Sequence, residues 1–254
     1  MANPEAGRAT GIAPTLALSL VIPTLNEAAS IERMIRNLDV IFREAGTPDY
    51  EIIVVDDNSP DGTGEIGDRL ALELPGHVQV IHRKCKASLG TAAVAGWQAA
   101  RGEVLALMDA DFQHPPDLLP RLLEAVRNGA DIAIGSRYTE GGGMSEQWDP
   151  IRKMISVSLT GFTRLLLRKA LRNVRDPFSG CFAMRRDVIE GKNLHPEGFK
   201  VLMEVLAVGS YATVREVPYQ FCSRTAGESK LRLRVVIDDF LLLLRLAWQT
   251  RRKR

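Results

Sequence analysis

Two aspartates separated by one residue, Asp109 and Asp111, have the spacing of a cation-binding pair. In an extended segment both carboxylates would point to the same side of the chain, where they repel each other unless a cation lies beside them. Mg²⁺ and Mn²⁺ prefer oxygen ligands, and Mg²⁺ commonly binds through one or two carboxylates and the phosphates of a substrate. Gln113 offers one further oxygen. The pattern predicts a metal–diphosphate site.

Other clusters of polar side chains follow other short apolar runs. They lie at residues 23–27 (PTLNE), 56–63 (DDNSPDGT) and 135–138 (GSRY, which contains Arg137). One acidic cluster after a strand is commonly only a turn or a helix cap. Several that meet at one edge of a sheet indicate a binding site.

The apolar runs alternate with stretches of helical periodicity, as in βαβ units. Strands are expected at residues 16–22, 51–55, 78–81, 104–108, 131–134, 182–184 and 214–217. Helices are expected at residues 26–42, 64–74, 91–100, 116–128 and 198–209. Such a chain forms an α/β fold with a mostly parallel sheet and helices on both faces, and ligands bind beyond the carboxyl ends of its strands. The polar clusters would then share one edge of the sheet.

Residues 62–67 (GTGEIG) match the G-x-G-x-x-G pattern of dinucleotide-binding proteins. That pattern should follow its strand at once, but residues 56–61 intervene and contain three aspartates, which would repel a pyrophosphate. We therefore expect these glycines to serve the turn and the start of the next helix.

The composition describes one sizeable folded domain, with 254 residues of which 45% are hydrophobic and 25% charged. It excludes a disordered chain, a collagen-like chain and a small disulfide scaffold. Cys85, Cys181 and Cys222 are far apart and match no zinc or redox pattern, so we expect buried, inert thiols in a reducing compartment. The histidines form no H-x-x-x-H pair, which argues against a zinc hydrolase.

The charge is divided unevenly along the chain, with a net −10 over residues 1–150 and +12 over residues 151–254. The basic half predicts an anionic partner, for which a phosphate ligand, a membrane surface and a nucleic acid are the candidates. Nucleic-acid binding without catalysis is disfavoured, because it would leave the carboxylate clusters without a role and no basic platform interleaved with aromatic residues is present.

Two amphipathic stretches, residues 150–172 and 231–248, carry basic residues beside an apolar stripe. The second is too short and too charged to span a bilayer, so we expect both to lie in the membrane interface, with the basic tail 251–254 on anionic headgroups. The alternative is that they pack on the core or on a separate transmembrane subunit. Residues 1–15 are expected to be a flexible leader and not a signal peptide.

Taken in order, the motifs resemble those of glycosyltransferase family 2, and more narrowly the dolichol-phosphate (polyprenol-phosphate) mannose synthase group. The segments that carry the resemblance are 21–27 (VIPTLNE), 54–63 (VVDDNSPDGT), 89–92 (LGTA), 108–111 (MDAD), 135–138 (GSRY) and 227–230 (GESK). It implies a GT-A fold with a catalytic domain over residues 16–230. It also implies a metal-dependent, inverting transfer of mannose from GDP-mannose to a polyprenyl monophosphate. Glucosyl or N-acetylhexosaminyl transfer, or a saccharide acceptor, remains an alternative within the superfamily.

The resemblance also implies roles for single residues. The donor nucleoside would be held by Pro23, Leu25, Glu27, Val55 and Asp57, although an aromatic residue is usual where this chain has Leu25. The donor diphosphate would meet Asp109, Ala110, Asp111, Arg224 and Lys230, and Lys200 would also line the nucleotide-sugar site. Asp111 and Gln113 would bind Mg²⁺ or Mn²⁺, and Arg137 with Arg152 would bind the acceptor phosphate. The enzyme would act as a peripheral protein on the cytoplasmic side of a membrane, without nucleic acid as a partner.

Overall fold

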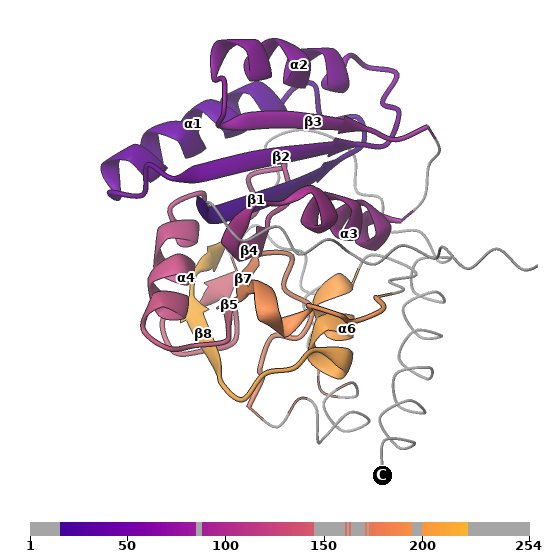
Figure 1. Cartoon of the computed structure of the whole chain (residues 1–254). Coiled ribbons are helices and arrows are strands. Elements are labelled where there is room, and N and C mark those ends of the chain that lie inside the picture. Colours follow the sequence, from indigo (N-terminus) through magenta and orange to yellow (C-terminus); the bar gives the residue numbers. More distant parts are fainter. Residues whose placement is uncertain are drawn as a thin grey trace, which may run out of the picture.

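The computed structural model describes residues 16–84, 88–144, 161, 163, 171, 173–194 and 200–222. A seven-stranded sheet with the order β3-β2-β1-β4-β7-β5-β8 forms its centre (Figure 1). The strands are β1 (Leu16–Thr24), β2 (Tyr50–Asp56), β3 (Val78–His82), β4 (Gly102–Leu107), β5 (Ile132–Ser136), β7 (Phe182–Arg185) and β8 (Val214–Pro218). Of these seven, β7 alone is antiparallel to its neighbours, β4 and β5. The predicted mostly parallel sheet is confirmed.

Helices cover both faces of this sheet. One core contains α1 (Ile31–Glu44), α2 (Thr63–Glu73) and α4 (Leu118–Arg127), and the other contains α3 (Leu89–Ala99) and α6 (Val201–Val208). Side chains alternate between the two cores along a strand, so that Leu20 and Ile22 of β1 enter the first and Val21 enters the second. Because both faces are covered, the central strands are apolar at almost every position.

The ends of most elements differ from the predicted ones by one to three residues. The first helix is the exception, because it begins at Ile31 and not at Asn26. The intervening backbone N–H groups donate to side chains of the loop after β2: Asn26 to Ser59 Oγ (3.0 Å), Glu27 to Thr63 Oγ1 (2.9 Å) and Ala28 to Asp61 Oδ2 (3.0 Å). These bonds hold residues 26–28 as a loop and bring the ends of β1 and β2 together.

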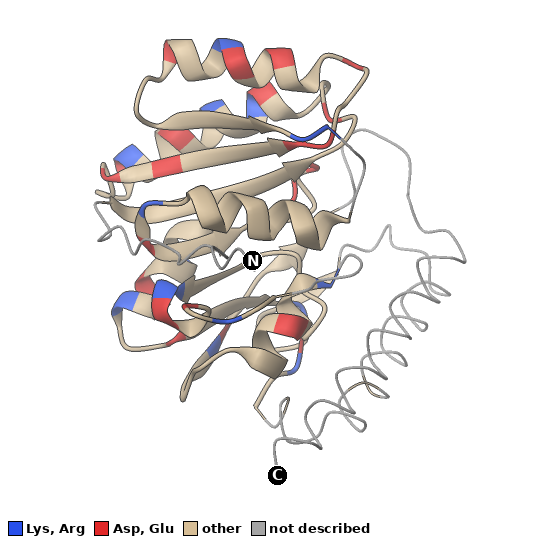
Figure 2. Cartoon of the chain, turned by 45° about the vertical axis from the view of Figure 1, so that its right-hand side comes forward, with Lys and Arg blue, Asp and Glu red and all other residues tan. Residues whose placement is uncertain are grey.

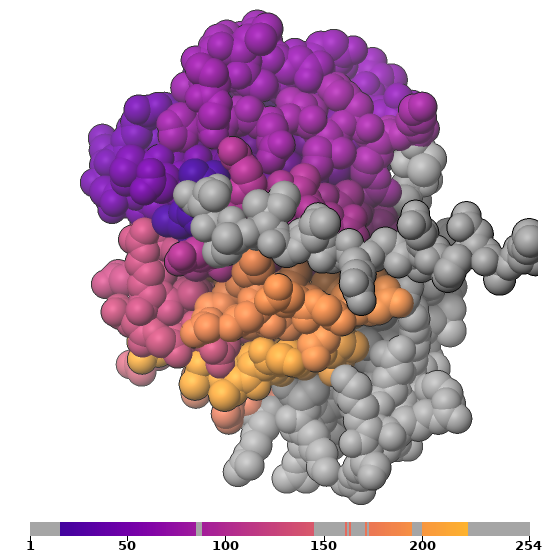
Figure 3. All heavy atoms as spheres, viewed as in Figure 1, coloured from indigo at the N-terminus to yellow at the C-terminus, as the bar shows by residue number. Residues whose placement is uncertain are grey.

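Three short elements were not predicted. β6 (Gly143–Met144) and β9 (Gln220–Phe221) form a separate two-stranded parallel sheet, and a 3-10 turn, η1, covers Arg186–Val188. Their length of two or three residues gives no periodic signal in the sequence. In the space-filling view, the amino-terminal segments and the orange to yellow segments of β7, α6 and β8 form one body (Figure 3).

The glycines of the GTGEIG motif have structural roles, as predicted. Gly62 precedes α2 with φ +90°. A Cβ on Gly64 would lie 2.8 Å from Cε1 of His82, and one on Gly67 would lie 2.9 Å from Cγ2 of Val80. The motif therefore makes the turn and lets α2 pack closely against β3.

The cysteine prediction is confirmed for one residue and wrong for another. Cys181 is buried, and burial raises the pKa of its thiol, whereas Cys222 is exposed. Cys222 directly follows buried Phe221 at the end of β9, where the next side chain turns outward. Cys85, the leader 1–15 and the tail 231–254 lie outside the described residues, as does most of 150–172. No helix in the described ranges is both long and apolar enough to cross a bilayer.

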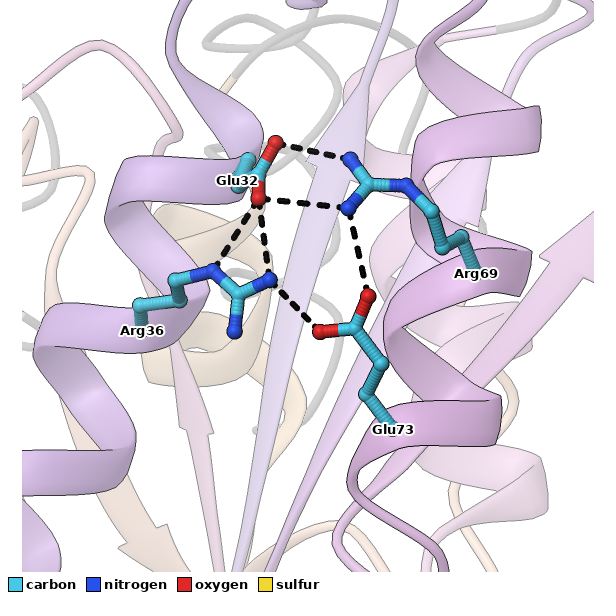
Figure 4. A network of polar contacts seen from close by, with 4 residues as sticks. All are labelled: Glu32, Arg36, Arg69 and Glu73. Atoms are coloured by element: carbon cyan, nitrogen blue, oxygen red, sulfur yellow. Dashed lines mark hydrogen bonds and ion pairs between the residues drawn. The ribbon is translucent and has the colours of Figure 1, made fainter.

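A ring of four charged residues joins the outer surfaces of α1 and α2 (Figure 4). Arg36 Nη2 lies 2.9 Å from Glu32 Oε1 and 2.6 Å from Glu73 Oε2, while Arg69 bridges the same two carboxylates at 2.7 and 3.2 Å. Hydrogen bonds from Arg69 and Arg36 lower the pKa of Glu32 to about 2. By contrast, α3, on the other face of the sheet, carries no charged residue and is uniformly tan in Figure 2.

Breaking this ring should weaken the docking of α2 on α1. A lowered carboxylate pKa adds stability above the ordinary pKa of 4.5, and that stability is lost as pH falls toward 2. We expect Arg69→Gln to lower the melting temperature by a few degrees at neutral pH, and by less at acid pH or high salt, because exposed pairs are screened. Arg185→Gln, which breaks an exposed pair with Asp187 two residues away, is the control. Equal deficits at all pH values and salt concentrations would contradict the role of the ring.

Candidate active site

The carboxyl ends of β1, β2, β4 and β5 lie at one rim of the sheet, because these strands are mutually parallel. The strand order reverses next to β1, because β2 and β3 lie on one side of β1 and β4 lies on the other. Ligands of open α/β sheets bind at such a switch point. The rim therefore brings together the polar clusters that the sequence analysis singled out.

Backbone strain is concentrated at the same rim. Among the described residues other than glycine, three have positive φ angles, and each follows a different strand: Asn26 (59°) after β1, Asn58 (57°) after β2 and Phe112 (59°) after β4. Asparagine tolerates this conformation, but for phenylalanine it costs on the order of 1–3 kcal/mol. The Phe112 ring packs on the core and under the guanidinium of Arg33, with Cζ 4.2 Å from the ring centroid. Strain held in this way between Asp111 and Gln113 is typical of a functional turn.

Two of the aspartates in the second cluster hold the loop itself. Asp56 accepts hydrogen bonds from Ser59 Oγ (2.5 Å) and Thr24 Oγ1 (3.2 Å), and Asp61 accepts from Thr63 Oγ1 (2.6 Å) and the Ala28 N–H (3.0 Å). These two carboxylates therefore stabilise a turn, which is the ordinary role of an acidic cluster after a strand. They shape the loop in which Asp57 lies.

Asp57 is oriented by an arginine that the sequence analysis missed. Arg83 directly follows β3, and its Nε lies 3.1 Å from Asp57 Oδ1 while its Nη2 donates to Thr91 Oγ1 at 2.9 Å. Thr91 also forms the capping box of α3 with Ser88. Nη1 of Arg83 is buried and has no hydrogen-bond partner among the described residues. The rule that polar side chains directly after a strand can form a site would have identified Arg83, because it follows the third strand.

The remaining residues expected around a nucleoside line the same end of β1 and β2. Pro23 and Val55 are paired in the β1–β2 register and are buried, with the Val55 side chain in the second core. Leu25 and Glu27 are partly exposed in the loop after β1. The structure thus places all five predicted nucleoside residues together, with Val55 beneath the surface.

The carboxylates after β4 occupy a confined corner of the rim. Asp111 is 4% exposed, and its Oδ1 accepts a hydrogen bond from the Gln113 N–H at 3.0 Å. A Cβ on Gly180 would lie only 2.6 Å from Asp109 Oδ2, so the glycine allows that carboxylate its position beside buried Ala110. Two carboxylates and an amide side chain form an oxygen donor set that fits Mg²⁺ or Mn²⁺. In the part of the chain described here, no group of three or more aspartate, glutamate, histidine or cysteine side chains is placed so that it could hold a metal ion by itself.

His114 closes this corner and was also missed. Its ring is 3% exposed and packs against Tyr219 and Phe221, with ring centroids 5.3 and 5.4 Å away. Burial, with the positive charges of Arg137 and Lys200, lowers the pKa of His114 to about 3, so the ring is neutral. Its Nδ1 and the Tyr219 hydroxyl are buried without a hydrogen-bond partner among the described residues. Such groups normally have partners, so both are candidates for contact with a bound substrate or water.

Arg137, at the end of β5, is buried in an ion pair. Its Nε and Nη2 donate to Asp176 Oδ2 (2.8 Å) and Oδ1 (2.7 Å), and the side chains are 8% and 0% exposed. The rings of Tyr138 and Phe221 lie 5.3 Å from Cζ. This pair holds the pKa of Arg137 above its ordinary value against the opposing effect of burial. The structure therefore shows a buried ion pair, and not the surface ion pair that is the ordinary role of such an arginine.

Lys200 immediately precedes α6, and its Nζ lies 5.4 Å from the ring centroid of Phe178. The positive charges of Lys200 and Arg137 both contribute to the lowered pKa of His114. Arg152, Arg224 and Lys230 lie outside the described residues. The chain approaches the last two from Cys222, whose N–H donates to the Gln113 carbonyl at 3.0 Å.

Comparison with known proteins accounts for this arrangement. Residues 19–191 match the profile of Glycosyl transferase family 2. The chain belongs to glycosyltransferase family 2. It is 44% identical to the Dolichol-phosphate mannosyltransferase of Pyrococcus furiosus over 90% of this chain and 63% of that protein, and thus spans less than two thirds of that relative. It is 38% identical to the Polyprenol monophosphomannose synthase of Mycolicibacterium smegmatis, over 87% of this chain and 83% of the relative.

A third relative, the Undecaprenyl-phosphate mannosyltransferase of Micrococcus luteus, is 42% identical over 83% of this chain and 86% of its own. These identities place this family 2 glycosyltransferase in the polyprenol-phosphate mannosyltransferase group, as the motifs predicted. Among solved structures, Mycobacterium tuberculosis glucosyl-3-phosphoglycerate synthase, in complex with Mn²⁺, UDP-glucose and phosphoglyceric acid, superposes with a TM-score of 0.65 at 19% identity, over 92% of this chain and 80% of that one. At this identity the likeness concerns the fold, and it confirms the GT-A expectation.

The closeness of Gly180 to Asp109 gives a direct test of the corner after β4. In Gly180→Ala the new methyl group would displace the Asp109 carboxylate, and displacements of this order cost about tenfold or more in rate. We expect a tenfold or larger loss of glycosyl transfer with little change in melting temperature. Gly161→Ala, at an exposed position with nothing within 4 Å of a Cβ, is the matched control. Transfer by Gly180→Ala at the control's rate would contradict a role for Asp109.

Proposed function

We propose that this enzyme transfers mannose from GDP-mannose to a polyprenyl monophosphate with inversion at the anomeric carbon, in the presence of Mg²⁺ or Mn²⁺. The observation that carries the proposal is the meeting, at one rim, of the oxygen donors of Asp109 and Asp111 with the buried guanidinium of Arg137. Asp109 and Asp111 suit a metal-bound diphosphate, and Arg137 suits a phosphate monoester. The names of the relatives support mannose as the transferred sugar and a polyprenyl phosphate as the acceptor.

On the donor side, charge accumulates on the departing nucleoside diphosphate as the glycosidic bond breaks. Asp111 and Gln113 would hold the divalent cation, which supplies Lewis-acid stabilisation of that charge when bound. Asp109 and Ala110 would border the diphosphate, and Lys200 would add a positive charge from the other side. Arg224 and Lys230 are proposed to complete this set.

On the acceptor side, the nucleophile needs no general base. A phosphate monoester has a second pKa of about 6 and is mostly dianionic at neutral pH. It requires a positively charged seat that offsets its repulsion from the donor phosphates. A guanidinium can supply two parallel hydrogen bonds to a phosphate, and we assign that role to Arg137, with Arg152 as a second cation.

The base of the nucleotide would lie at the ends of β1 and β2. Asp57 offers an acceptor oxygen, and the buried Nη1 of Arg83 offers a donor. Guanine carries both donor and acceptor groups on its edge, which this pair could match. A glucosyl or N-acetylhexosaminyl donor, and a saccharide acceptor, are the alternatives.

We also propose that the enzyme works as a peripheral protein at the cytoplasmic side of a membrane, where a polyprenyl phosphate presents its headgroup. The apolar stripes and basic residues of 150–172 and 231–254 support this placement. A separate transmembrane subunit that covers these stripes is the alternative.

The proposal is tested with purified full-length protein, a panel of labelled nucleotide sugars and a polyprenyl phosphate in detergent or liposomes. We expect label from GDP-mannose to enter the lipid fraction in the presence of Mg²⁺ or Mn²⁺, and transfer to fall at least about a hundredfold after chelation, because the metal offsets charge in the transition state. Label from another nucleotide sugar would favour the alternative donor. Transfer to a saccharide but not to the lipid would contradict the proposed acceptor.

A further inference from the structure

Asp176 lies beside the acceptor side of the site, on a segment that the antiparallel strand β7 brings to the rim. Because β7 runs opposite to β4 and β5, the residues before it lie at the carboxyl ends of those strands. Asp176 is fully buried and accepts three hydrogen bonds from Arg137: from the backbone N–H (3.0 Å), Nε (2.8 Å) and Nη2 (2.7 Å). Both the backbone and the side chain of the arginine are thus fixed by one carboxylate.

We propose that Asp176 is a positioning residue of the transfer reaction, which holds the Arg137 guanidinium so that its free edge receives the acceptor phosphate. The inference rests on the proposed function, because it takes the polyprenyl phosphate as the ligand of Arg137.

The geometry of a guanidinium explains how Arg137 could bind Asp176 and a phosphate at the same time. The group has five N–H donors on Nε, Nη1 and Nη2, which form two edges that can each bind an oxyanion through two bonds. Asp176 occupies the edge of Nε and Nη2. The other edge, of Nη1 and Nη2, is left for a phosphate, and Nη1 makes no hydrogen bond within the described part of the chain. One arginine can therefore bind a protein carboxylate and a substrate phosphate at once.

A second carboxylate fixes Asp176 in turn. Glu216 of β8 accepts hydrogen bonds at Oε1 from the backbone N–H groups of Arg175 (2.9 Å) and Asp176 (2.8 Å). Since β8 pairs with β5, and Arg137 directly follows β5, both partners of the ion pair are anchored to neighbouring strands. Such a support is what an arginine needs if its orientation, and not only its charge, matters for the reaction.

Asp176→Asn tests the proposal. The amide would turn an N–H₂ group toward the guanidinium, so the charge of Arg137 remains but its orientation is lost. We expect kcat/KM for polyprenyl phosphate to fall at least tenfold, while the Kd for GDP-mannose stays within twofold of wild type. Arg137→Lys, which keeps the charge but not the planar fork of donors, should show the same loss.

The matched control is Glu51→Gln, because Glu51 is another buried carboxylate paired with an arginine, Arg101, near the amino end of β2. It should lower the melting temperature without changing kcat/KM for the acceptor. If Asp176→Asn does not fold, Glu216→Ala replaces it: it should impair acceptor use in the same direction, and Glu216→Gln, which keeps Oε1, should restore it.

Three results would overturn the inference. The first is unchanged acceptor kcat/KM in Asp176→Asn, or in Glu216→Ala where the former does not fold. The second is an equal loss for donor and acceptor in Asp176→Asn, which would indicate a purely structural pair. The third is a wild-type enzyme that does not use polyprenyl phosphate at all, and this result alone would also overturn the proposed function.

Discussion

The position of the two carboxylates that follow β4 is the constraint on which the proposed site depends. The parallel strands fix where the chain leaves the sheet, and the left-handed turn at Phe112 holds the segment between Asp111 and Gln113. Gly180 leaves room for Asp109 beside it. We propose that a cation offsets the charge of these two carboxylates, while packing elsewhere in the fold keeps them in place.

The rim is divided electrostatically into two halves. Carboxylates and Arg83 follow β1, β2, β3 and β4, whereas Arg137 follows β5 and Lys200 precedes α6. Arg83 is paired with Asp57 and Arg137 with Asp176, so neither guanidinium is an uncompensated buried charge. Such pairs leave the arginine orientated in advance, so substrate anions can bind without reorganising the site.

Much of the fold could be predicted because its strands are apolar on both faces and its helices are amphipathic, as in β2 and α1. The rule that ligands bind after parallel strands located Asp57, Asp109, Asp111 and Arg137. It could not separate Asp56, which holds a turn, from Asp57, because both are acidic and adjacent. Asp176 and Gly180 precede an antiparallel strand, so their place at the rim follows only from the tertiary pairing of β7.

We propose that a divalent cation binds beside Asp111 together with the donor nucleotide. It is tested most directly by crystals of the enzyme grown with Mn²⁺ and GDP and measured at the manganese absorption edge. The account predicts an anomalous peak within coordination distance of the Asp111 carboxylate, in contact with the diphosphate, and its loss in Asp111→Asn. A nucleotide bound away from this carboxylate, or a manganese peak unaffected by the substitution, would contradict it.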